Sequence, residues 1–114
     1  MKKIPEIINC AKPTENEIIL TLEVAPDLFW FKGHFPECPV LPGVAQVHWV
    51  MHFAQIYFPD LQTFQAMERV KFQSPILPCK EIKLILKQDK PSHQLSFTFS
   101  VTQTIKSQGK IRFQ

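Results

Sequence analysis

The segment from residue 43 to 58 constrains the fold more than any other part of the chain, because apolar residues crowd every side of it. The run is too long for an ordinary strand, and its pattern favours a buried helix. Pro42 precedes it where proline is tolerated at a helix start, and Pro59 and Asp60 follow as a stop signal. We therefore predict one buried helix over about residues 43 to 58.

The segments on both sides of this helix alternate apolar and polar residues, which is typical of half-buried strands. The strands expected from the alternation cover residues 17–24, 65–73, 82–87, 95–102 and 109–113. Asp89, Lys90 and Pro91 indicate a turn, so the two strands beside them should form an antiparallel hairpin. A weaker strand runs from Ile4 to Ala11, ended by Lys12-Pro13. These elements predict an α+β fold with an antiparallel sheet wrapped around one long central helix.

Length and composition fit a single domain over residues 1–114, because 45% apolar residues with ten phenylalanines can fill one core. A fold this short buries only about 65% of its unfolded surface, so we expect an oligomer. The net charge of +3 is spread along the chain without a run of like charges, which argues against nucleic acid as a partner. A mild positive excess suits an acidic protein partner.

The three cysteines, Cys10, Cys38 and Cys79, are odd in number, widely spaced and without a C-x-x-C pair, so no disulfide framework or zinc knuckle is implied. Met1-Lys2-Lys3 is followed by Ile4-Pro5-Glu6, which is not the pattern of a signal peptide. The longest apolar stretch contains several polar residues and is too short to cross a bilayer. We expect a cytoplasmic protein without a membrane anchor.

Prolines gather just before the predicted helix. Pro36, Pro39 and Pro42 follow one another at a spacing of three, with Gly33 before them and Gly43 after. Such a loop is irregular in path yet stiff, and reacting groups are often held in loops of this kind at helix N-termini. We interpret it as the active-site loop.

The loop also carries a family resemblance. The stretch Gly33-His34-Phe35-Pro36-Glu37-Cys38-Pro39-Val40-Leu41-Pro42-Gly43-Val44 resembles the active-site signature of bacterial 3-hydroxyacyl-(acyl-carrier-protein) dehydratases. Residues 71–78, Lys-Phe-Gln-Ser-Pro-Ile-Leu-Pro, resemble the strand and turn that follow in that family. Residues 43–49 and 107–110 further resemble the small dehydratases of aryl polyene gene clusters.

The resemblance implies a hotdog fold, paired into a dimer with composite active sites, and it implies roles for individual residues. The catalytic histidine falls on His34, and the oxyanion-binding backbone N–H falls on Gly43. The carboxylate that the partner's helix contributes falls on His48, so the chain departs from the family there. His52 likewise replaces a glutamine. The residues expected to bind substrate are Phe35, Val40, Leu41, Pro42, Trp49 and His52.

The function implied is dehydration of (3R)-hydroxyacyl chains on acyl carrier protein to trans-2-enoyl thioesters, in fatty acid or aryl polyene type biosynthesis. His34 has a suitable reference pKa, about 6.5, for the base, and a protonated His48 can serve as the acid near neutral pH. We expect no cofactor and no metal. A homodimer is expected, with a heterodimer containing a paralogous dehydratase as the alternative.

Other interpretations stay open at this point. The chain is alternatively a hotdog thioesterase, although no carboxylate stands in the loop or early helix, or a non-catalytic subunit that completes a dehydratase partner. His48 and His52 lie one helical turn apart and with His34 are a weak candidate for a metal site. Cationic residues that could receive an acidic carrier are Lys32, Arg69, Lys71 and Lys80.

Overall fold

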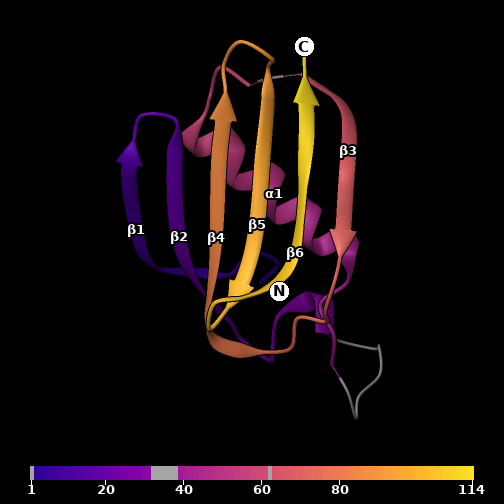
Figure 1. Cartoon of the computed structure of the whole chain (residues 1–114). Coiled ribbons are helices and arrows are strands. Elements are labelled where there is room, and N and C mark those ends of the chain that lie inside the picture. Colours follow the sequence, from indigo (N-terminus) through magenta and orange to yellow (C-terminus); the bar gives the residue numbers. More distant parts are fainter. Residues whose placement is uncertain (1, 32–38, 62) are drawn as a thin grey trace.

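In the part of the chain that the structure describes, a six-stranded antiparallel sheet packs against one α-helix (Figure 1). The computed structural model describes residues 2–31, 39–61 and 63–114. In chain order the elements are β1 (Glu6–Thr14), β2 (Glu17–Val24), the short 3-10 helix η1 (Phe29–Phe31), α1 (Gly43–Tyr57), β3 (Phe64–Phe72), β4 (Cys79–Asp89), β5 (Gln94–Val101) and β6 (Thr104–Phe113). The strand order is β1-β2-β4-β5-β6-β3. The predicted α+β class is confirmed, and so is the long helix that starts at Gly43.

The core lies between the sheet and one side of α1. Alternate residues of β2, β4 and β5 are buried as their spacing predicts, among them Leu20, Leu84 and Phe99, which face one another in register. From the helix, Trp49 meets Phe99 edge-on with ring centroids 6.4 Å apart. Burying one such large apolar side chain contributes roughly 1.5–3 kcal/mol, which explains why the period-2 pattern fixes which face of each strand is inside.

The helix is buried on one side only, whereas its apolar composition predicts burial all round. Val44 is 70% exposed and Ile56 is 54% exposed. In Figure 1 the sheet lies across one side of α1. The apolar residues on the other side therefore remain uncovered within one chain.

Two predicted strands have the wrong limits. The first strand runs from Glu6 to Thr14, through Pro13, because β1 is an edge strand and the pairing with β2 is irregular between Ala11 and Thr14. The last strand starts at Thr104 rather than residue 109. Its hairpin turn uses Thr102 and Gln103 with φ of 48° and 66°, without the glycine or asparagine that normally marks such a turn.

Over the residues that the structure describes, no helix is long and apolar enough to cross a membrane.

Candidate functional site

Four of the predicted site residues lie together at the start of α1. Val40, Leu41, Pro42 and Gly43 line a cavity of about 300 Å³. Its other lining residues are Gln46, Phe72, Gln73, Ser74 and Pro75. The cavity thus joins the proline-rich loop to the end of β3, the two segments that carry the family resemblance. His34 and Phe35 lie outside the described residues.

Backbone hydrogen bonds hold the loop to the connection between β3 and β4, and hold that connection to β6. The Leu41 N–H donates to the Ile76 carbonyl at 2.8 Å, and Leu41 itself is buried. Beyond β3, the N–H groups of Gln73 and Ser74 both donate to the Lys106 carbonyl, at 2.9 and 3.0 Å. Backbone hydrogen bonds therefore anchor both the loop and the segment after β3, two of the segments that line the cavity.

Gly43 is the first residue of α1, and its N–H has no acceptor within the helix. Pro42 is the N-cap and provides no side-chain cap; its carbonyl accepts the N–H groups of Ala45 and Gln46. The Gly43 N–H therefore lies at the positive end of the helix dipole, where it can stabilise a developing negative charge.

The side of Gly43 that lacks a side chain is occupied by Phe72. A Cβ built on Gly43 would lie 2.7 Å from Phe72 Cζ and 2.9 Å from Cε2. Only glycine allows the ring to pack this closely against the backbone at the mouth of the helix. Phe72 belongs to the site although its residue type gave no sign of it; the resemblance of residues 71–78 was the available signal.

The helix residues that were assigned to the site do not line this cavity within one chain. His48 is exposed and lies beside Trp30, with ring centroids 5.8 Å apart. His52 is half-buried and packs against the Phe53 ring. Trp49 is fully buried in the core, and its indole N–H donates to the Lys3 carbonyl at 2.8 Å.

For Trp49 the structure thus gives a role in packing.

Within the described residues, no three His, Cys, Asp or Glu side chains gather where they could hold a metal ion.

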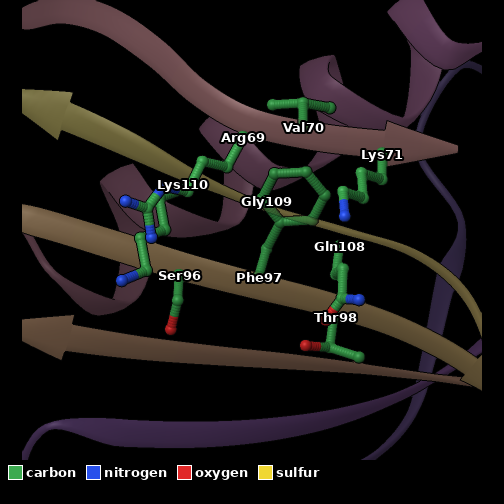
Figure 2. A pocket seen from close by; sticks show the side chains of 9 residues that line it. All are labelled: Arg69, Val70, Lys71, Ser96, Phe97, Thr98, Gln108, Gly109 and Lys110. Atoms are coloured by element: carbon green, nitrogen blue, oxygen red, sulfur yellow. The ribbon is translucent and has the colours of Figure 1, made fainter.

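A second cavity, of about 440 Å³, lies over β3, β5 and β6 (Figure 2). Its nine lining residues are Arg69, Val70, Lys71, Ser96, Phe97, Thr98, Gln108, Gly109 and Lys110. Arg69 adopts a left-handed conformation with φ of 54° where the β3–β6 pairing is irregular. The nearby carboxylate of Glu68 is paired with Arg112. Among the described residues that line the cavity, three are cationic and none is a carboxylate.

Comparisons with known proteins agree with this architecture. The ApeI-like family model, described as ApeI dehydratase, matches residues 10–110. The solved dehydratase heterocomplex ApeI:P from Xenorhabdus doucetiae contains a chain 42% identical to this one. That match covers 98% of this chain and 97% of the other, with a TM-score of 0.88. An uncharacterized protein from Erwinia carotovora subsp. atroseptica is 41% identical, with 93% and 90% covered and a TM-score of 0.79.

Among curated proteins, the 3-hydroxyacyl-(acyl-carrier-protein) dehydratase FabZ of Streptococcus agalactiae is 32% identical over 81 residues, which are 65% of this chain. The match spans 58% of that enzyme's length. The family model covers most of the chain, and the predicted hotdog fold is confirmed by the structural match. The chain belongs to the ApeI-like dehydratase family.

Proposed function

We propose that the chain, as a single hotdog domain in the cytoplasm, takes part in dehydrating (3R)-hydroxyacyl thioesters to trans-2-enoyl thioesters. The observation that carries the proposal is the cavity at the N-terminus of α1, lined by Gly43, by the active-site loop and by the end of β3. The Gly43 N–H has no acceptor within the helix and is therefore available to a ligand there. A thioester carbonyl placed there would accept that hydrogen bond. One such donor is worth roughly 10² to 10³ in rate, because it strengthens as the enolate charge develops.

The chemistry needs a base and an acid besides this donor. In our proposal His34 removes the α-proton at C2, the electron pair forms the C2–C3 double bond, and the C3 hydroxyl leaves with a proton as water. The proton for the leaving hydroxyl comes from a side chain on a partner's helix. His48 is this chain's counterpart of that group, and it does not line its own cavity.

Assembly with a second chain is supported by apolar surface that one chain leaves uncovered. Val44 and Ile56 are exposed on α1, and Phe64, Met67 and Phe72 are about half exposed on β3. Because β3 is an edge strand of the sheet, this surface is a natural pairing site for another chain. We infer a heterodimer with a paralogous dehydratase, supported by the likeness to a chain of the ApeI:P heterocomplex. A homodimer is the alternative.

The carrier partner in this proposal is an acidic acyl carrier protein. Arg69, Lys71 and Lys110 form the cationic part of the cavity in Figure 2. That surface adjoins the Gly43 cavity, since Lys71 precedes Phe72 and the Gln108 amide donates to Gln73 Oε1 at 3.0 Å. Opposite charges at this place would speed the encounter with the carrier and orient it.

The test is reversible hydration of enoyl thioesters by the purified chain, alone and with the neighbouring paralogue. The proposal predicts turnover that His34→Ala abolishes. Release of free thiol would instead indicate a thioesterase. Turnover that needs the paralogue and is indifferent to both His34→Ala and His48→Ala would identify the chain as a non-catalytic subunit. A gain of activity in His48→Glu would show that the histidine is a compromised substitute for the family's carboxylate.

A further inference from the structure

The Gln46 side chain is a polar group buried next to the candidate site. It is 3% exposed, on the first turn of α1. Its Nε2 donates to the Leu41 carbonyl at 3.2 Å, and its Oε1 accepts a hydrogen bond from Ser107 Oγ at 2.6 Å. Ser107 has no exposed surface. Both the nitrogen and the oxygen of the amide are therefore hydrogen-bonded. Because the Leu41 carbonyl can only accept, it must face the amide nitrogen, and this fixes the orientation of the amide.

These two bonds connect three parts of the fold. Leu41 belongs to the active-site loop, Gln46 to the helix and Ser107 to β6. In the sheet, Ser107 lies between Phe99 of β5 and Phe72 of β3, and Phe72 is the ring that packs on Gly43. Gln46 is thus hydrogen-bonded to Ser107, which lies beside Phe72 in the sheet, and Phe72 lines the cavity.

The same bonds fix the backbone that leads into Gly43. The Leu41 N–H is held by the Ile76 carbonyl and the Leu41 carbonyl by Gln46. Without the Gln46 amide, the Leu41–Pro42 peptide would lose the bond that sets its carbonyl direction. Because hydrogen bonds weaken steeply as their angle departs from linear, a small rotation here would reduce what the Gly43 N–H contributes.

We propose that Gln46 and Ser107 act as a positioning pair that aims the Gly43 N–H at the thioester carbonyl. The inference rests on the proposed dehydratase function and assigns the pair no direct contact with the reacting atoms. A buried amide and hydroxyl would otherwise serve only stability, so the two roles must be separated by experiment.

The separating variants are Ser107→Ala and the double variant Gln46→Met with Ser107→Ala. The single change leaves Gln46 Oε1 buried without its donor, whereas the double change removes both partners together. Removing both is less costly to stability than leaving one unpaired. If the pair only stabilises the fold, the double variant should therefore recover activity along with stability. The matched control is Ser100→Ala on β5, the same chemical change away from the Gly43 cavity.

The experiment measures kcat and KM for enoyl-thioester hydration by the assembled complex, below the melting transition of each variant. We expect kcat to fall about tenfold or more in both variants, with KM changed less than about twofold, because the lost interaction acts in the transition state. The amide resonance of Gly43 in ¹⁵N-labelled chain should shift in both. Ser100→Ala should keep the wild-type kcat and Gly43 resonance.

Wild-type kcat in the double variant would overturn the positioning role, as would an unchanged Gly43 resonance. An inactive wild-type complex is a different result: it refutes the proposed dehydratase function itself, and the role of the pair falls with it.

Discussion

Replacing Gly43 by alanine should remove most of the activity and leave the stability of the fold nearly unchanged. The new Cβ would lie 2.7, 2.9 and 3.1 Å from the three outer atoms of the Phe72 ring. Phe72 is 51% exposed, so the ring can turn aside at a cost of about 0.5–1.5 kcal/mol. Alanine regains up to about 1 kcal/mol in helix propensity. The net change in the free energy of unfolding should stay within about 1 kcal/mol.

The expected loss of activity is much larger. The methyl group and the displaced ring would occupy the cavity beside the Gly43 N–H and keep the thioester carbonyl from it. Losing one donor of this kind costs about 10² to 10³ in rate, or about 2.7–4 kcal/mol. Steady-state hydration of an enoyl thioester by the assembled complex measures this loss, and urea unfolding of the chain measures its stability.

Gly109→Ala is the matched control for stability. A Cβ at Gly109 would lie 2.8 Å from Val70 Cγ2 and 3.0 Å from both the buried Phe97 ring and the Val70 backbone. Because backbone cannot turn aside, this change should destabilise the chain by about 1–3 kcal/mol. Wild-type kcat/KM in the Gly43→Ala complex would contradict the role of the Gly43 N–H. A Gly43→Ala chain as unstable as Gly109→Ala would contradict the expectation that the Phe72 ring turns aside.

Three further outcomes follow from the surfaces and from Cys79. The double variant Lys71→Glu with Lys110→Glu should raise the KM for carrier-bound substrate about tenfold more than it raises the KM for a carrier-free thioester. High salt should remove this difference, because it screens the charges. Equal increases in the two KM values would exclude this surface as the carrier site. Ile56→Glu should change the chain's stability by less than about 0.5 kcal/mol but weaken the complex at least about tenfold by sedimentation; an unchanged complex would place the interface elsewhere. Burial raises the pKa of the Cys79 thiol, although a backbone hydrogen bond from Glu81 and the Lys106 charge lower it in part. In a variant whose other cysteines are replaced by serine, alkylation of Cys79 at pH 8 should therefore be slower in the folded chain than in urea. The difference between the two rates should shrink as the pH rises through the folded-state pKa. Equal rates at pH 8 would contradict the raised pKa.

The strands could be predicted because burial of one face imposes a period of two, and the helix because its apolar run is too long for a strand. Leu20, Leu84 and Phe99 alternate with polar neighbours along strands that have one buried face, so the pattern alone places them. The limits of β1 and β6 were predicted wrongly, because they depend on how each strand pairs with its neighbour in the sheet. Pro13 is tolerated only at an edge, and the turn at Thr102 and Gln103 is imposed by the hairpin.

The site could be predicted only in part, and for a similar reason. The loop from Val40 to Gly43 is contiguous, so its motif identifies it. Phe72 lines the cavity, and Ser107 donates a hydrogen bond to the Gln46 amide. The two residues lie side by side because of the register between β3 and β6, which a local sequence pattern does not reveal. His48 does not line the cavity of its own chain, so the role we propose for it depends on a second chain, which the sequence of one chain does not describe.

The proposed function is tested by dehydration of a (3R)-hydroxyacyl carrier protein by the chain assembled with a paralogous dehydratase, compared between wild type and His34→Ala. We expect a trans-2-enoyl product from the wild-type complex and a rate lower by at least about 10²-fold for the variant, since a positioned base typically contributes that much or more. Undiminished turnover in His34→Ala would contradict it.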